Sequence, residues 1–251
     1  MNLVYGIHPV EILLNTSPDR VLALYYIPRK SPSTKIISLI EEARKRRIPV
    51  NAVGPEEAPP GAHPHQGIWA RVRAFQYTAL APWLSRQKER TVATLVILDG
   101  VTDPQNLGAI IRTASCMGCQ GILLPKNRSA SIRPAVWKAS AGAVAALPIL
   151  RAINLARTIE HLKREGFWIF GTRAENATPL WEAPWTEKTA IILGSEGKGI
   201  RPLLRSRCDF HLAIPMSGQV PSLNVSVAAG MILYERVRWL ATHQRKEPHV
   251  L

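Results

Sequence analysis

The sequence predicts an α/β fold, with a small N-terminal α/β domain followed by a larger domain whose mostly parallel sheet carries helices on both faces. Short apolar segments alternate with helical segments through the second half of the chain, as in a parallel sheet covered on both sides. A polar stretch at 78–91 has no clear period and separates two differently patterned regions. The 251 residues, 46% of them hydrophobic, are enough for two modest domains. We therefore predict domains at 1–77 and 92–251, joined by a linker at 78–91.

The first domain is predicted to begin with a short strand and a helix at 11–15. The apolar run at 21–27 is typical of a strand. A helix at 34–47 has apolar residues on one side and ends in a basic cluster, which suits the C-terminal end of a helix dipole. Several prolines at 55–64 predict a loop, and the alternating pattern at 67–75 predicts a strand.

The second domain alternates more regularly. Strands are predicted at 94–98, 121–124, 167–171, 190–193 and 211–214, and helices at 106–117, 135–141, 155–165, 201–205 and 223–240. Ligands of such sheets bind at the carboxyl ends of the strands. The loops that follow Leu98, Leu193 and Ile214 are therefore the expected position of a functional site.

The charge of the chain favours a polyanionic partner. Its 32 lysines and arginines exceed its 18 aspartates and glutamates by 14, and both halves share the excess, with +6 on residues 1–90 and +8 on residues 91–251. A basic surface attracts nucleic acid and gains free energy by releasing the condensed counterions. No basic amphipathic segment suits a membrane surface. RNA or DNA is the expected partner, and a membrane is not.

No targeting signal or metal site is expected. No stretch reaches the roughly 18 uninterrupted apolar residues of a spanning helix, and the N-terminus lacks the signal-peptide pattern, which predicts a cytoplasmic protein. Cys116 and Cys119 form a CxxC pair, and Cys208 and His211 a CxxH pair, but about 90 residues separate the pairs where a zinc site usually has about 12 to 20. We expect the cysteines to be buried small hydrophobes.

The loop after Leu98 leads into a helix that carries two candidate residues. Asn106 lies near the start of this helix, where it is either a functional residue or simply the N-cap. Arg112 lies among apolar neighbours on the same helix, so its guanidinium needs an anionic or hydrogen-bonding partner, either a ligand or a structural salt bridge.

The other two loops are also rich in functional residue types. The segment Gly-Ser-Glu-Gly-Lys-Gly at 194–199 joins a strand to a helix, and it is either a simple turn or a cradle whose amides bind an anion or a nucleoside. Glu196 stands at its tip. The loop after Ile214 places Ser222, Asn224 and Ser226 around the first turn of the last helix, where capping explains one of them but hardly all three.

Together, these loops resemble the three motifs of the SpoU family of the SPOUT superfamily. The first motif is met by Asn-Leu-Gly-Ala-Ile-Ile-Arg-Thr-Ala at 106–114, the second by residues 194–199, and the third by Ile-Pro-Met-Ser-Gly at 214–218 with Ser-Leu-Asn-Val-Ser at 222–226. The runs that begin at Tyr5 and His65 are similar to the ends of the family's N-terminal substrate-binding domain. The resemblance thus covers the whole chain.

The resemblance implies an S-adenosylmethionine-dependent methyltransferase acting on RNA ribose 2′ hydroxyls. The loop after Leu98 and the run Pro-Lys-Asn-Arg-Ser-Ala at 125–130 look most like the bacterial 23S ribosomal RNA guanosine-2′-O-methyltransferases. One departure is Val-Ala-Ala at 144–146, where those enzymes often carry a glutamate. The family also implies a deep trefoil knot in the second domain, a homodimer formed around it, and a ribosomal-protein-like domain at 1–77 that binds the RNA substrate.

The resemblance and the residue types together give the candidate site. The catalytic candidates are Asn106, Arg112, Glu196, Ser222 and Asn224. The candidates for binding S-adenosylmethionine are Leu193, Gly194, Glu196, Gly197, Ile214, Met216, Ser222, Leu223 and Asn224. The candidates for binding RNA are Arg44, Arg47, Arg71, Arg73, Arg128 and Arg133. Arg112 is expected to stabilise a developing alkoxide or to hold an RNA phosphate, with Asn106 and Glu196 orienting Arg112 and the substrate.

Two other functions compete with this one. A non-catalytic RNA-binding or ribosome-assembly factor of the same fold is opposed by the complete set of candidate catalytic residues. A transfer RNA ribose methyltransferase of the same family is less well matched by the separate N-terminal domain. The charged run at 44–47 is also consistent with a solvated helix end.

Overall fold

The computed structural model describes residues 3–29, 31, 33–58, 65–173, 176–218 and 222–243. The chain forms two compact units. The first comprises Met1–Gln76 with Ser131–Ala146, and the second comprises Tyr77–Ala130 with Leu147–Leu251. The first unit therefore takes in a later piece of the chain, which the sequence pattern places within the range 92–251.

The first unit contains a four-stranded mixed sheet in the order β1-β4-β2-β3. Its strands are β1 (Leu3–Tyr5), β2 (Val21–Tyr26), β3 (Val50–Ala52) and β4 (Ile68–Val72), and its helices are α1 (Ile7–Thr16), α2 (Thr34–Lys45) and α5 (Pro134–Ala139). β4 pairs antiparallel with β1 and β2, whereas β2 and β3 are parallel. Helices α1 and α2 contact each other, and α5 contacts β1. The expected strands and helices are confirmed, and β3 is an additional strand.

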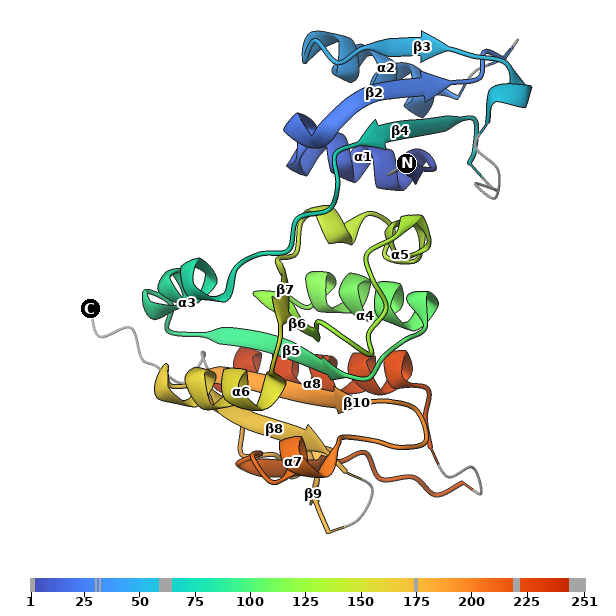
Figure 1. Ribbon diagram of the computed structural model, residues 1–251. Helices are drawn as coiled ribbons and strands as arrows, with labels where there is room; N and C mark the ends of the chain where they lie inside the picture. The colour runs from blue at the N-terminus through green and yellow to red at the C-terminus, as the bar shows by residue number, and fades with distance from the viewer. Residues whose placement is uncertain are drawn as a thin grey trace. The chain divides into compact units, whose positions relative to one another are not determined.

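The second unit contains a seven-stranded sheet in which every pairing is parallel (Figure 1). The order is β7-β6-β5-β10-β8-β11-β9. The strands are β5 (Ala93–Asp99), β6 (Gly121–Pro125), β7 (Ile149–Ala152), β8 (Trp168–Thr172), β9 (Thr178–Pro179), β10 (Lys188–Gly194) and β11 (Phe210–Ala213). The helices are α3 (Leu80–Lys88), α4 (Pro104–Cys116), α6 (Leu155–Arg164), α7 (Pro202–Arg205) and α8 (Val225–His243). The predicted parallel sheet is confirmed, and β7 and β9 are additional strands.

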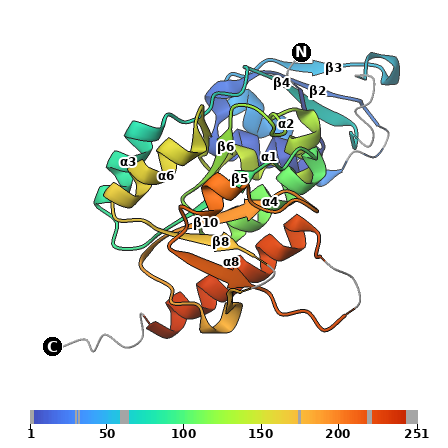
Figure 2. The same ribbon diagram turned by 60° about the horizontal axis from the view of Figure 1, so that its bottom comes forward.

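Helices cover both faces of this sheet, as expected. Figure 2 shows α3 and α6 on one face and α4 and α8 on the other. Leu95 and Ile97 of β5 belong to a core with Trp83 of α3 and Ile159 of α6. The alternate residues of the strand point to the opposite face, where α4 and α8 contact each other. All seven residues of β5 are buried, because it lies between β6 and β10 near the middle of the sheet.

The segment expected as a linker contains helix α3. Leu80, Trp83, Leu84 and Gln87 recur at helical spacing, and the last three are buried. The indole of Trp83 donates to the carbonyl oxygen of Gln120 at 2.9 Å. The helical period is hard to recognise in the sequence because Pro82 lies within the helix and the polar Gln87 lies on its buried face. Among the described residues, no helix is long and apolar enough to span a lipid bilayer.

Candidate active site

Three loops meet at the carboxyl edge of the parallel sheet in the second unit. β5 and β10 pair in parallel, with Leu98 opposite Leu193 and Asp99 opposite Gly194, so their loops leave the sheet side by side. The loop after β11 leads to α8, which packs on α4. Residues from the three loops therefore come together although about 120 residues separate the first from the last.

Asn106 is not the N-cap of α4. That position belongs to Asp103, whose carboxylate oxygens accept from the backbone amides of Gln105 at 3.1 Å and Asn106 at 3.3 Å. The side chain of Asn106 is thereby left free of a capping role. Its Nδ2 instead donates to Oε1 of Glu196 at 3.0 Å. The simple capping interpretation of Asn106 is therefore excluded.

The glycine-rich loop is a tight hairpin that presents Glu196. Ser195 and Gly199 exchange two backbone hydrogen bonds of 3.2 and 2.9 Å. A Cβ atom on Gly194 would lie 2.0 Å from the carbonyl carbon of Gly199, so no larger residue fits where the loop returns to the strand. Gly197 and Gly199 have φ angles of 77° and 63°, which a side chain would strain. The glycines are therefore required by the turn, and Glu196 is held at its exposed tip.

Glu196 accepts hydrogen bonds from two of the three loops. Its Oε1 accepts from Nδ2 of Asn106 at 3.0 Å, from Nδ2 of Asn224 at 2.8 Å and from the amide of Val225 at 3.3 Å. Nδ2 of Asn224 also donates to Oδ1 of Asn106 at 2.9 Å. Asn106, Glu196 and Asn224 thus form a closed triangle of hydrogen bonds, which we call the carboxamide triangle. Oε2 of Glu196 has no hydrogen-bond partner among the described residues.

The orientation of the Asn224 amide is set by helix α8. Its Oδ1 accepts from the backbone amides of Ser226 at 2.8 Å and Val227 at 3.4 Å, as an N-cap does, and from the hydroxyl of Ser226 at 2.6 Å. The oxygen must face these donors, so Nδ2 faces Glu196. Asn224 is therefore both a helix cap and a member of the carboxamide triangle.

A second polar contact joins the first two loops behind the triangle. The carboxylate of Asp99, only 2% exposed at the end of β5, accepts from Nε and Nη2 of Arg201 at 2.7 Å each. Its other oxygen accepts from the backbone amide of Arg201 at 2.9 Å. Arg201 directly precedes α7 and follows the glycine-rich hairpin. Neither residue was predicted from the sequence, although a buried strand that ends in Asp and leads into a candidate loop is an informative signal.

A pocket of about 450 Å³ lies between the glycine-rich hairpin, the end of β11 and the start of α8. The residues expected to bind the cofactor line it, with the exception of Asn224. Thr172 and Arg173 at the end of β8, together with Lys198 and Arg205, also line it and were not predicted. Burial lowers the pKa of His211 on β11, and the nearby charges of Arg173 and Arg205 lower it further. This end of the pocket is therefore electropositive.

Arg112 lies outside the carboxamide triangle. It is exposed on α4, six residues after Asn106, and makes no hydrogen bond or ion pair with any residue in the described part of the chain. The structure therefore does not provide the contact to Asn106 or Glu196 that was expected to orient it. The alternative of a structural salt bridge is not observed among these residues either. A guanidinium held at the surface without a protein partner is free to meet an anionic ligand.

The arginines expected to bind RNA are exposed in both units. Arg44, Arg47, Arg71, Arg73 and Arg133 are in the first unit and Arg128 is in the second. Of the cysteines, Cys119 is buried, Cys208 half-buried and Cys116 exposed, so burial was wrongly expected for Cys116. Its position in the last turn of α4, away from the helix's buried face, accounts for the difference. Within the described ranges, no three histidine, cysteine, aspartate or glutamate residues are grouped as metal ligands.

Comparison with known proteins identifies the family. Residues 93–234, more than half of the chain, match the SpoU rRNA Methylase family. The chain belongs to the SpoU methylase family. Residues 3–78 of this SpoU protein match the family described as RNA 2′-O ribose methyltransferase substrate binding.

Full-length relatives support the assignment of this SpoU protein. It is 41% identical to the 23S rRNA (guanosine-2′-O-)-methyltransferase RlmB of Coxiella burnetii over 98% of this chain and 96% of the relative. It is 40% identical to the RlmB of Shewanella oneidensis over 94% of this chain and 97% of the relative. It is also 42% identical, over 81% of its length and 83% of the relative, to a putative TrmH family tRNA/rRNA methyltransferase of Staphylococcus aureus.

Solved structures show the same fold. The SpoU methyltransferase AviRb from Streptomyces viridochromogenes, in complex with the cofactor AdoMet, superposes with a TM-score of 0.78 and 26% identity. The match covers 96% of this chain and 90% of AviRb. An rRNA methyltransferase from Sinorhizobium meliloti, with 24% identity and a TM-score of 0.77, covers 95% of this chain and 87% of its own and has the same fold.

Proposed function

We propose that this SpoU protein transfers a methyl group from S-adenosylmethionine to the ribose 2′ hydroxyl of a guanosine in 23S ribosomal RNA. The observation that carries the proposal is the similarity, over nearly the full length of both chains, to two proteins named for this reaction. The match to a substrate-binding family at residues 3–78 extends the similarity beyond the methylase unit. The net charge of +14 suits an RNA substrate.

The pocket beside the glycine-rich hairpin fits S-adenosylmethionine. Its volume of about 450 Å³ is in the range of small-molecule sites. Leu193, Ile214 and Leu223 give apolar walls for an adenine ring. Glu196 offers a carboxylate oxygen that has no partner in the described part of the chain, which suits an ammonium or a sulfonium. Arg173 and Arg205 suit a carboxylate. When bound, the cofactor supplies a methyl group on a positively charged sulfur.

The protein's task is to align the ribose and to stabilise charge. We assign to Arg112 the stabilisation of negative charge that develops on the 2′ oxygen, or the binding of a neighbouring phosphate. Arginine keeps its proton in proteins, so its role is electrostatic, and the hydroxyl proton passes to another acceptor. The carboxamide triangle holds Asn106 and Asn224 in single orientations beside the pocket. A preorganised polar group lowers a barrier because it does not need to reorient during the reaction.

The proposal includes three properties implied by the family. These are the trefoil knot in the second unit, a homodimer formed around it, and action in the cytoplasm. The apolar side chains of Val227, Met231 and Tyr234, which are 47%, 44% and 62% exposed on α8, support a protein contact on this helix. Sedimentation of the purified chain tests the dimer.

The reaction is tested by transfer of labelled methyl from S-adenosylmethionine to unmodified ribosomal RNA. A 2′-O-methyl group makes the adjacent phosphodiester resistant to alkali, so nuclease mapping of the resistant product identifies the nucleotide. We expect 23S RNA to be methylated at one guanosine, which is recovered as 2′-O-methylguanosine. Transfer to transfer RNA alone would favour the second candidate, which the similarity to a putative tRNA/rRNA methyltransferase supports. RNA binding without transfer to either substrate would favour a non-catalytic factor.

A further inference from the structure

A second pocket, of about 390 Å³, lies at the same carboxyl edge of the sheet in the second unit. It is formed by the end of β6, the segment between β7 and α6, and the start of α7. In the sheet order, β6 is separated from β10 by β5 alone, so the two strands lie about 10 Å apart. The second pocket is therefore close to the proposed cofactor pocket but contains none of the candidate catalytic residues.

The polar side of the second pocket is suited to a phosphate. Arg128 is exposed and carries no acidic partner among the described residues. Arg201 reaches the same pocket, and its side chain is 48% exposed although it binds Asp99. The first-turn amides of Leu155 and Ala156 in α6 have no intrahelical acceptor and no other described partner. Two arginines and the N-terminus of the ten-residue helix α6 thus line one space.

The apolar side of the pocket is suited to a nucleobase. Ile153 is 88% exposed, which is the largest exposure of any described large hydrophobic residue. Pro125 and Leu203 line the same pocket, and Leu203 is 58% exposed. Apolar surface beside cationic groups matches a nucleotide, whose base stacks on apolar or aromatic groups while its phosphate binds arginine.

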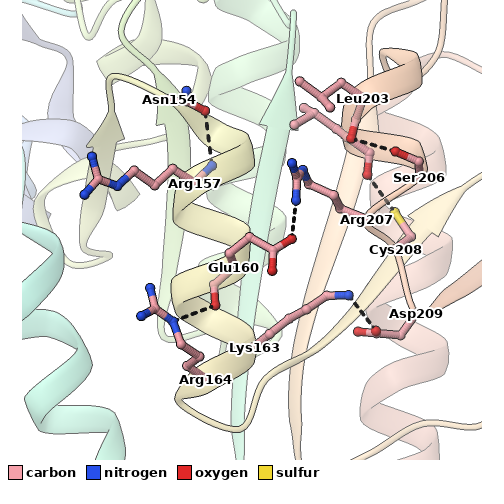
Figure 3. Close-up of polar contacts among 11 residues, drawn as sticks. Asn154, Arg157, Glu160, Lys163, Arg164, Leu203, Ser206, Arg207, Cys208 and Asp209 are labelled. Carbon is pink, nitrogen blue, oxygen red and sulfur yellow. Dashed lines mark hydrogen bonds and ion pairs between the residues drawn. The ribbon is translucent and has the colours of Figure 1, made fainter.

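Ion pairs and hydrogen bonds join the segments that form the pocket. Figure 3 shows Lys163 and Glu160 of α6 paired with Asp209 and Arg207, which follow α7 in the chain. The contact between Lys163 and Asp209 is 2.7 Å long. The loop after β6 is anchored by the amide of Lys126, which donates to Ala152 at 2.7 Å, and by the amide of Ala130, which donates to Val101 at 3.0 Å. Arg128 has a φ of 59° in this loop, a conformation that costs a residue other than glycine about 1 kcal/mol or more.

We propose that this second pocket binds a nucleotide of the RNA substrate other than the one that is methylated. Arg128, with Arg201 and the α6 amides, holds its phosphate, and Ile153 supports its base. The pocket lies on the edge that also carries the cofactor pocket, so a strand whose target nucleotide enters the catalytic site passes near it. The inference rests on the proposed function, because it takes RNA as the substrate.

The test compares charge and surface variants in the full chain. Arg128→Glu and Ile153→Glu are each expected to raise KM for a 23S RNA fragment about tenfold or more, with kcat at saturating RNA within about twofold of wild type. The affinity for S-adenosylmethionine without RNA stays unchanged. Arg164→Glu is the matched control, because it makes the same charge change at the exposed C-terminal end of α6. Its KM is expected to stay within about twofold of wild type.

Two further measurements separate phosphate contact from base contact. Arg128→Gln is expected to lower the slope of log affinity against log salt by about 0.7, which is one phosphate contact to single-stranded RNA. RNA fragments that each lack one base near the target nucleotide test the base contact. For the wild-type protein, we expect a higher KM when the base at one particular position is missing. For Ile153→Ala, we expect no such increase. Unchanged KM in both glutamate variants would overturn the proposal. The proposal would also be overturned if guanosine monophosphate bound saturably through Arg128 while substitution of Arg128 left the affinity for RNA unchanged.

The failure of the proposed function has a different signature. If wild type transfers no methyl group to any RNA, the methyltransferase assignment fails. Filter binding of the same RNA fragment to wild type, Arg128→Glu and Arg164→Glu then still tests the nucleotide pocket. An affinity lost only in Arg128→Glu supports the pocket, and equal affinities contradict it.

Discussion

The buried carboxylate of Asp99 binds both the guanidinium and the backbone amide of Arg201, at distances of 2.7 to 2.9 Å. This contact joins the end of β5 to Arg201, two residues after the glycine-rich hairpin ends at Gly199. The hairpin therefore has two attachments: one to Asp99 through Arg201 and one to α4 and α8 through Glu196. Neither Asp99 nor Arg201 lines the pocket beside the hairpin, and we expect the shape of that pocket to depend on their contact.

Asp99→Asn is expected to destabilise the fold and to weaken cofactor binding. The substitution removes the charge that balances Arg201 and places amide hydrogens against its donors. We expect a loss of about 1 to 3 kcal/mol in the free energy of unfolding and about a tenfold weaker affinity for S-adenosylmethionine. Urea denaturation and calorimetric titration measure the two effects. Lys88→Ala, which breaks the exposed pair between Lys88 and Glu165, is the control and should cost less than about 1 kcal/mol. Equal behaviour of the two variants would contradict this role for Asp99.

Asn224→Asp separates the two roles of Asn224. An aspartate keeps the oxygen that caps α8 but places a second carboxylate oxygen where Nδ2 donates to Glu196 at 2.8 Å. We expect kcat/KM to fall about a hundredfold because the carboxamide triangle is broken. Ser226→Ala removes only the hydroxyl that donates to Oδ1 of Asn224 and is expected to change kcat/KM by less than about threefold. An aspartate variant with wild-type kcat/KM would show that the triangle has no part in the reaction.

Arg236 on α8 is a buried arginine with few polar partners among the described residues. Its side chain is 1% exposed, and Nη2 donates to the carbonyl of Glu187 at 2.9 Å. Nε and Nη1 have no hydrogen-bond partner within the described ranges. The guanidinium lies 4.9 Å from the ring centroid of Trp239. Burial lowers the pKa of Arg236 to about 10, despite the opposing charge of Glu187. Below that pH, the folded protein must hold the charged form in an apolar setting.

Replacing Arg236 by methionine is therefore expected to leave stability unchanged or to raise it. A folded pKa below the unfolded value means that the unfolded chain binds more protons above about pH 10, so wild-type stability rises with pH there relative to the variant. The difference in unfolding free energy between variant and wild type should be constant from about pH 7 to 9 and should fall above about pH 10. If the difference in unfolding free energy between variant and wild type stayed constant above about pH 10 as well, the pKa of Arg236 would not be lowered.

The three cysteines are expected to react at very different rates. Burial raises the pKa of the Cys119 thiol to about 12 and that of Cys208 to about 11, so both are protonated near about pH 8. Cys116 is exposed on the last turn of α4. Alkylation of the native protein, followed by peptide mass spectrometry, should label Cys116 at least about ten times faster than the others, with equal labelling after unfolding. Rapid native labelling of Cys119 would show that the packing around it opens.

Strong periodicity explains why much of the second unit was predicted correctly. The segments that became β5, β10 and α6 are apolar runs or amphipathic helices of ordinary length. β7 and β9 have only four and two residues and carry no clear pattern. The sequence around α5 predicts a helix but contains nothing that indicates which unit it packs against. That choice depends on contacts between segments far apart in the chain.

The candidate site, like the fold, was predicted in part. Three loops were recognised from residue type and position, because polar residues after buried strands are informative. The hydrogen bonds between Asn106, Glu196 and Asn224 depend on the register of β5 with β10 and on the docking of α8, which no local pattern contains. Asp103 could have been recognised as the cap of α4, because Asp followed by Pro is a common helix start. That signal would have freed Asn106 for a functional role.

The most direct test of the account is methyl transfer by Arg112→Ala. Arg112 is exposed and unpartnered in the described structure, so its removal should change the free energy of unfolding by less than about 0.5 kcal/mol and leave S-adenosylmethionine affinity intact. Under single-turnover conditions, the rate of transfer to 23S RNA is expected to fall at least about a hundredfold, with a smaller loss for Arg112→Lys. Wild-type transfer by a folded, cofactor-binding Arg112→Ala protein would contradict the proposed catalytic role and the site built around it.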